Sequence, residues 1–239
     1  MPLHVPPAPA PALRSVLSAL GSPAAVNDAH TPALRAHQGP MTVELPLPVH
    51  VLDRLHTSHL AAGGRPPRTR LTGWRFLIRG GDRFIAAADT RLTPEGWVFS
   101  HFFEGPYVAA TERALRQAES LGSNFQPRLL SVPELYMLTL WLHGAVGADA
   151  SAGLPAAADL LVPLAPAPPG IAAYRPHPVS ELLPVLTHRL TPPLPPELAA
   201  PPPPDHPFHP DGPFGPSPLG PPGEPPKNDR GVDLNRPHG

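Results

Sequence analysis

The chain has 239 residues and a formal net charge of -1, and 42 of its residues are proline. This proline content is more than three times the roughly 5% of average proteins, which excludes regular packed secondary structure from much of the chain. The near-neutral charge and the scattered arginines provide no basic face for phosphate binding, so we expect no nucleic-acid partner.

The sequence contains no cysteine, which excludes disulfides, thiolate zinc sites and cysteine nucleophiles. No stretch approaches the roughly 20 apolar residues of a membrane span, and the N-terminus lacks the basic and apolar regions of a signal peptide. We therefore expect a cytoplasmic protein without membrane contact. Abundant alanine and proline, with a single lysine among the basic residues, are typical of GC-rich coding and give a bacterial-like composition.

Both ends of the chain are rich in proline. Residues 1–40 contain one weak helical run, "PALRSVLSAL", and we predict a disordered N-terminal arm. In residues 191–239, 18 of 49 residues are proline, which predicts a disordered or polyproline II tail. Residues 41–190 are predicted to form a single domain with its core in 71–175. Because Met41 opens the better patterned region, both Met1 and Met41 are candidate starts.

In chain order, the first patterned segment is 48–64, where apolar residues at helical spacing predict a helix that the pair of glycines ends: Val49, Leu52, Leu55 and Leu60. Three histidines and an aspartate share this predicted helix: His50, Asp53, His56 and His59. No further ligand lies nearby in the sequence, so we interpret them as solvated side chains and not as a metal site.

A three-stranded antiparallel meander follows. Residues 73–79 alternate apolar and polar side chains, and the sequence "GGD" then forms a tight turn to a strand over 83–92. The sequence "TPEG" has proline and glycine where a β-turn favours them. The third strand is predicted over 97–102, with Trp97, Phe99 and His101 on one face.

An amphipathic helix is predicted after the meander, beginning at Pro106 and ending before Gly122. Its apolar positions fall on one side, which predicts a helix packed across the sheet: Tyr107, Val108, Ala110, Ala114, Leu115, Ala118 and Leu121.

The remaining elements complete an α+β fold. Residues 127–132 read as a strand, whereas 133–144 fit either a helix or a hairpin of buried strands, of which the Tyr, Thr and Trp content favours strands. Residues 159–164 read as a strand in which Pro163 requires an edge or a bulge. A short helix interrupted by Pro184 is expected over 179–190. The meander, the helix and two or three further strands thus predict an antiparallel sheet with disordered proline-rich arms.

The candidate catalytic residues are His101 and Glu104, at the end of the third strand. A spacing of three residues would bring two metal ligands to the same side on a helix, but these two residues lie at the end of a strand and in a turn. We therefore interpret His101 as a partly buried side chain beside Trp97 and Phe99. Glu104 is explained by the dipole of the helix that follows. Tyr107, Tyr136 and His143 are the candidate ligand-binding residues. No metal site and no cofactor are predicted, since phosphate loops and nucleophile elbows are absent from the sequence.

These observations favour a non-catalytic protein-interaction or accessory module, which would contact another protein through its sheet edge or its proline-rich tail. The alternative is an enzyme or a small-ligand-binding domain with a pocket near His101 and Glu104. The sequence does not decide whether the protein is an enzyme, although the lack of a catalytic signature favours the first hypothesis. It identifies no substrate, partner or oligomeric state.

Overall fold

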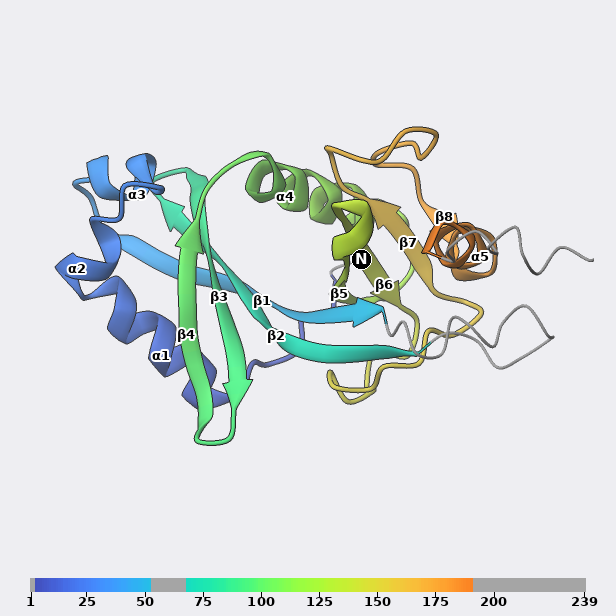
Figure 1. Ribbon diagram of the computed structural model, residues 1–239, viewed down its shortest axis with the longest axis horizontal. Helices are drawn as coiled ribbons and strands as arrows, with labels where there is room; N and C mark the ends of the chain where they lie inside the picture. The colour runs from blue at the N-terminus through green and yellow to red at the C-terminus, as the bar shows by residue number, and fades with distance from the viewer. Residues whose placement is uncertain (1–2, 53–67, 191–239) are drawn as a thin grey trace, which may run out of the picture. The chain divides into compact units, whose positions relative to one another are not determined.

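The computed structural model describes residues 3–52 and 68–190 of the chain. All of them belong to the first of two compact units, residues 1–193, and the second unit, 194–239, lies outside the described residues. The described strands form one sheet in the order β4-β3-β2-β1-β5-β6-β7-β8, with helices against it, so the α+β class is confirmed (Figure 1). Neighbouring strands are antiparallel except for β1 and β5, which makes the sheet mixed, where a wholly antiparallel one was predicted.

The strands are β1 (Met41–Leu52), β2 (Thr69–Gly80), β3 (Arg83–Thr93), β4 (Gly96–Phe103), β5 (Gln126–Val132), β6 (Met137–His143), β7 (Leu160–Pro163) and β8 (His177–Pro178). The helices are α1 (Ala10–Leu20), α2 (Pro23–Val26), α3 (Pro32–Ala36), α4 (Pro106–Glu119) and α5 (Val179–Leu190), and a 3-10 turn, η3 (Pro133–Leu135), lies between β5 and β6.

The predicted meander is confirmed as β2, β3 and β4. Gly81 and Gly96 take positive φ angles of 67° and 122° in the two connecting turns, a conformation that glycine adopts without the steric cost of a Cβ. The strands were predictable because their apolar alternation and their turn residues agree.

A bulge in β4 changes which side chains face which side of the sheet. Asp89 of β3 pairs with His101 and Thr90 pairs with Phe99, so Ser100 is an extra residue without a partner. Phe99 packs on the α1 side of the sheet, whereas His101 lies on the opposite side with its ring 5.6 Å from that of Phe103. The prediction that His101 is partly buried on the face of Phe99 is therefore wrong, and its side chain is exposed.

The N-terminal residues 3–40 are folded, and for them the prediction of a disordered arm is corrected. Each of the helices α1, α2 and α3 has a proline in its first turn, where the missing N–H is not needed. Ala12, Val16 and Leu34 are fully buried against the meander. The domain therefore includes residues that precede Met41, while the predicted disordered tail, 191–239, lies outside the described residues.

The helix predicted over 48–64 is also corrected, as far as the structure describes it. Residues up to Leu52 belong to β1, whose alternating side chains pack on both faces of the sheet between β2 and β5. Pairing on both sides outweighs a helical spacing of four apolar residues. Asp53, His56 and His59 lie outside the described residues.

The amphipathic helix is confirmed as α4, with Pro106 in its first turn and Gly122 at a φ of 72° just after it. Val108, Ala114 and Leu115 on its apolar side are buried against β1, β2, β3 and β6. In Figure 1, α1 to α3 lie near β4 and α5 lies near β8, at the two ends of the sheet.

The 3-10 turn η3 and then the strand β6 follow β5, so the strand favoured by the sequence is confirmed for Met137–His143 and residues 133–144 form no α-helix. β7 ends at Pro163, which pairs with β6 but lies beyond the two residues of β7 that pair with β8. The side of β7 away from β6 is therefore an unpaired edge at Pro163, where the missing N–H removes no bond between strands. The last helix, α5, continues through Pro184.

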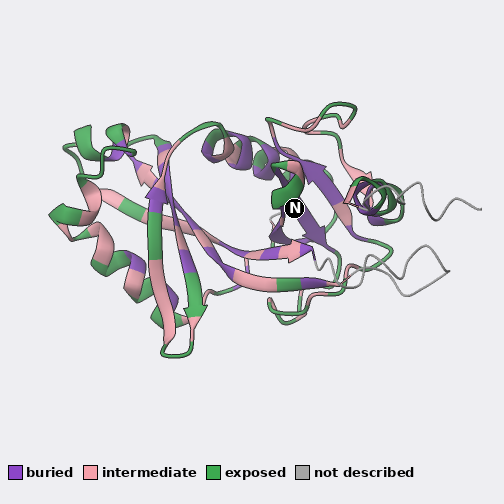
Figure 2. Cartoon of the chain, viewed as in Figure 1, coloured by how far each residue is buried: buried purple, intermediate pink, exposed green. Residues whose placement is uncertain are grey.

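Most residues of β5, β6 and β7 are buried (Figure 2), and α1, α4 and α5 each contribute further buried residues. Among the described residues, no helix is both long and apolar enough to cross a membrane.

Candidate functional site

Three of the five candidate residues line one groove. His101, Tyr107 and Tyr136 come from β4, α4 and the turn before β6, and they border a groove of about 610 Å³ on the α4 side of the sheet. We call it the tyrosine groove. Its other lining residues come from six segments of the chain: Arg75, Phe103, Ser131, Pro133, Met137, Leu138 and Pro166.

A hydrogen bond between two tyrosines shapes this groove. The Tyr107 hydroxyl donates to the carbonyl oxygen of Tyr136 at 2.7 Å, and the Pro166 carbonyl oxygen lies 3.2 Å from the same hydroxyl. Burial raises the pKa of Tyr107, so the hydroxyl stays protonated and keeps its donor at neutral pH. The backbone of Tyr136 is thereby held in place.

Tyr136 has an unusual conformation for a large residue. Its φ is 49°, in the left-handed region, and its side chain is 89% exposed. A left-handed backbone costs a residue with a Cβ roughly 1–2 kcal/mol. The exposed ring gains little from burial in return, so the fold alone does not account for tyrosine at this position.

The positive charge of Arg75, which lines the tyrosine groove, is neutralised by an ion pair. The guanidinium of Arg75 donates two hydrogen bonds to the Asp89 carboxylate, at 2.8 and 2.9 Å, and lies 4.4 Å from the centre of the Phe103 ring. His101 has the Ser100 hydroxyl 3.1 Å from its Nδ1. Within this lining no carboxylate contacts His101, so the groove lacks the paired acid and base of a hydrolytic site.

The Glu104 side chain is turned toward the N-terminus of α3 and does not line the tyrosine groove. Its two carboxylate oxygens accept the backbone N–H groups of Ala33 and Leu34, at 3.1 and 2.8 Å. The interpretation of Glu104 as a carboxylate beside a helix N-terminus was correct in kind, but the helix is α3 and not α4. The structure therefore separates Glu104 from His101.

His143 is buried on the opposite face of the sheet. Its Nδ1 lies 2.8 Å from a carboxylate oxygen of Asp159, a fully buried residue that also accepts the Trp141 indole N–H at 2.7 Å. The backbone N–H groups of Gly144 and Ala156 complete the set of donors at 2.9 Å each. Four donors thus satisfy the buried Asp159 carboxylate. The His143–Asp159 pair therefore has a structural role, because it holds the segment from 144 to 158 against the sheet.

Buried polar side chains fix that segment, which we call the 144–158 loop. Arg128 donates to the carbonyl oxygens of Asp149 and Ala152, and its Nε donates to Gln126. The Gln126 amide donates in turn to the carbonyl oxygens of Val146 and Ala148. Burial lowers the pKa of Arg128, and its charge is offset by these carbonyl groups and by the Trp141 ring, 4.9 Å from the guanidinium carbon.

His50 completes this network from β1. Its Nε2 lies 2.9 Å from the Ala150 carbonyl oxygen and must therefore carry the proton, which leaves Nδ1 to accept the Thr69 hydroxyl at 3.0 Å. Burial lowers the pKa of His50 to about 4, so the ring is neutral at physiological pH. His50, one of the three histidines on the helix predicted over 48–64, is therefore a buried structural residue and not a solvated side chain.

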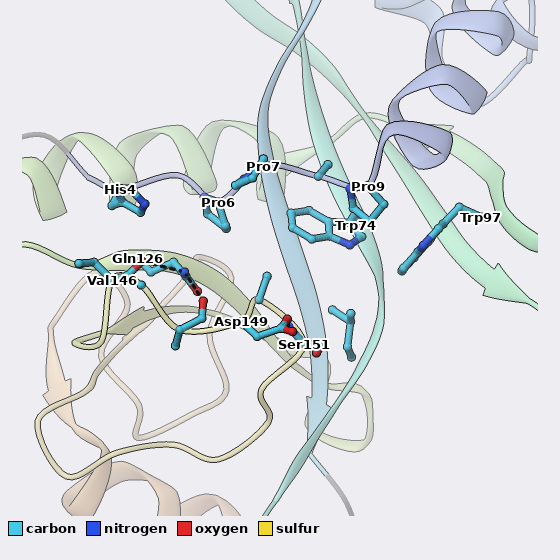
Figure 3. Close-up of a pocket in the computed structure, with 15 residues that line it drawn as sticks. His4, Pro6, Pro7, Pro9, Trp74, Trp97, Gln126, Val146, Asp149 and Ser151 are labelled. Carbon is cyan, nitrogen blue, oxygen red and sulfur yellow. Dashed lines mark hydrogen bonds between the residues drawn. The ribbon is translucent and has the colours of Figure 1, made fainter.

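A second groove, of about 510 Å³, lies beside the 144–158 loop on the α1 side of the sheet (Figure 3). We call it the tryptophan groove. One wall is the N-terminal segment with Pro6, Pro7 and Pro9, and the other is the loop from Val146 to Ser151. The remaining lining residues are His4, Ala8, Leu71, Trp74, Trp97 and Gln126.

Trp74, which lines the tryptophan groove, carries a buried donor without a partner. The Trp74 side chain is 2% exposed, and its indole N–H has no hydrogen-bond partner in the described structure. A buried N–H without an acceptor is rare and costs about 1–3 kcal/mol. The strand predicted over 73–79 includes Trp74, but a strand pattern does not show where a hydrogen bond is missing, so this unpaired N–H could not be predicted from the sequence.

Within residues 3–52 and 68–190, no three histidine or acidic side chains lie close enough together to hold a metal ion. The buried cluster around Arg128 and Asp159 was likewise missed, since a charged residue in an apolar strand carries no sequence signal of burial. Comparisons with protein-family models, with curated proteins and with solved structures return no match to this chain.

Proposed function

We propose that this protein is a non-catalytic interaction module that binds an extended apolar segment of a partner protein in the tyrosine groove. The observation that carries the proposal is Tyr136, which is 89% exposed in a strained left-handed conformation and is held there by Tyr107. A strained and exposed aromatic residue costs folding free energy, and such residues persist where they serve binding.

The lining of the groove supports recognition of an apolar chain. Phe103, Pro133, Met137 and Pro166 provide apolar and aromatic surface, and the charge of Arg75 is satisfied by Asp89. A groove of this composition offers contact area and adaptable packing, not a reactive centre.

The neighbouring edge strand supports the same proposal. No described strand pairs with the outer edge of β4, and its sequence from Gly96 to Phe103 contains no charged residue and no proline. Charges and prolines are two of the usual protections of an edge strand, and β4 has neither, although the bulge at Ser100 interrupts its edge. The regular parts of β4 are suited to adding a strand from a partner. Contact through the proline-rich tail stays a prediction, since the tail lies outside the described residues.

The alternative, an enzyme or small-ligand-binding domain, required His101 and Glu104 to act together. Both oxygens of Glu104 are occupied by N–H groups of α3, and His101 has no carboxylate partner among the lining residues. The geometry therefore favours the interaction module.

Site-specific photo-crosslinking tests the proposal. Benzoylphenylalanine placed at position 136 should capture a partner in native lysate, and the same group at Leu92, exposed on β3, should not. The purified partner should then bind Tyr136→Ala about tenfold more weakly than wild type and Leu92→Ala equally well. Capture at both positions, or equal affinity for both variants, would refute this site.

A further inference from the structure

The tryptophan groove lies on the opposite face of the sheet from the tyrosine groove. Arg75 lines one and Trp74 lines the other, and consecutive residues of a strand point to opposite faces. What binds in the tryptophan groove is therefore a separate question from the function proposed above.

Hydrogen bonds from the buried side orient the 144–158 loop. The carbonyl oxygens of Val146, Ala148, Asp149 and Ala150 all accept donors from the buried side chains of Gln126, Arg128 and His50. In a trans peptide the N–H points opposite to the C=O of the same unit. The N–H groups of Gly147, Asp149 and Ala150 are therefore directed away from the core, on the side where residues 146–151 line the groove.

These N–H groups have no acceptor in the structure as far as it is described, and neither has the indole N–H of Trp74. The loop wall of the groove thus presents these three N–H donors, while four of its carbonyl acceptors are turned inward and used. A complementary ligand must supply hydrogen-bond acceptors and need not supply donors.

The charge of the groove disfavours an anion as that ligand. Asp149 lines the groove, and the backbone N–H of Ser151 lowers the pKa of its carboxylate, which is ionised at neutral pH. Among the described lining residues, His4 is the only basic one. An uncharged, acceptor-rich ligand fits this environment better than a phosphate or a carboxylate.

We infer that the tryptophan groove binds a proline-rich peptide segment of a partner protein in the polyproline II conformation. Proline has a carbonyl acceptor and no N–H, which matches the unpaired N–H groups of the loop wall and adds no donor that would need a partner there. Grooves that bind such segments are lined by aromatic rings, as this one is by Trp74 and Trp97. The chain's own Pro6, Pro7 and Pro9 form one wall of this groove, with Trp74 and Trp97 lining it as well (Figure 3).

Titration of the full-length protein with the octaproline peptide Ac-(Pro)8-NH2, followed by ¹H–¹⁵N NMR, tests this inference. The indole resonance of Trp74 and the amide resonances of Gly147, Asp149 and Ala150 should shift saturably. The Trp141 indole, bonded to Asp159, is an internal control that should not move. The peptide Ac-(Gly-Ser)4-NH2, of equal length, should cause no saturable shift.

Binding to two variants, and titration of the wild type with sodium phosphate, serve as controls for this test. Trp97→Ala should bind octaproline about tenfold more weakly, and Leu121→Ala, exposed beyond α4, should bind as wild type does. An unchanged Trp141 indole resonance confirms that each variant is folded. The inference is overturned if wild type shows no saturable shift with octaproline, if the Gly-Ser peptide binds equally, or if sodium phosphate alone shifts the same amides.

Discussion

The Tyr107 hydroxyl donates a 2.7 Å hydrogen bond to the carbonyl oxygen of Tyr136. This bond joins the start of α4 to the turn before β6, two elements that are 29 residues apart in sequence. It fixes a backbone whose φ of 49° would otherwise be free to relax. The wall of the tyrosine groove therefore depends on one side chain of the amphipathic helix.

Replacing Tyr136 by glycine should not destabilise the fold. Glycine adopts a left-handed φ without the cost of a Cβ, and an 89% exposed ring contributes little burial. We expect Tyr136→Gly to raise the free energy of unfolding in urea by up to about 1 kcal/mol. Tyr136→Ala retains a Cβ and should give no such gain; a gain of equal size in both variants would contradict the strain argument.

Glu104 should contribute to stability and not to binding. Its carboxylate accepts the N–H groups of Ala33 and Leu34, so Glu104→Gln loses the charge and one good acceptor. We expect a loss of about 1 kcal/mol in the free energy of unfolding. Glu112→Gln, at an ion pair with Arg116 on the surface of α4, is the matched control and should lose much less. An equal loss in the two variants would show that Glu104 has no special role.

The meander and α4 were predictable because several local signals agree in them. Apolar alternation, a glycine in each turn, Pro106 at the helix start and Gly122 just after its end all indicate the same elements. Where local signals agree in this way, secondary structure can be predicted from the sequence without knowledge of tertiary contacts.

The incorrect predictions concern features that depend on contacts between distant parts of the chain. The single extra residue Ser100 reverses the facing of His101, and nothing in "WVFSHF" marks where a bulge falls. Proline content suggested a disordered start, but the prolines occupy first turns of helices that the meander stabilises. The convergence of Tyr107 with Tyr136 follows from the sheet order, which the sequence does not show.

Acid should destabilise the protein partly through His50. Its pKa is about 4 in the folded state and near 6.5 when unfolded, so the unfolded state binds more protons between these values. Stability is therefore lost as the pH falls through this window, by about 2 kcal/mol between pH 7 and pH 5 from this group. His50→Asn should show a correspondingly smaller loss in urea unfolding at the two pH values. An identical pH dependence in variant and wild type would contradict the assignment.

A protein that starts at Met41 should be less stable than the full chain. Ala12, Val16 and Leu34 cover Trp74, Phe76 and Ile78 of β2, and removing that cover exposes several large side chains at about 1.5–3 kcal/mol each. We expect a lower melting temperature and increased binding of a hydrophobic dye compared with the full chain. Equal melting temperatures for the two chains would show that the N-terminal helices do not contribute to the core.

The most direct test of the proposed function measures binding and stability in the same variant. Tyr136→Gly should bind the partner captured at position 136 at least about tenfold more weakly than wild type, while its free energy of unfolding is equal or higher. That combination would show that Tyr136 is retained for binding at a cost to the fold. Wild-type affinity in Tyr136→Gly would contradict the account, because it would leave the exposed and strained tyrosine without a role in recognition.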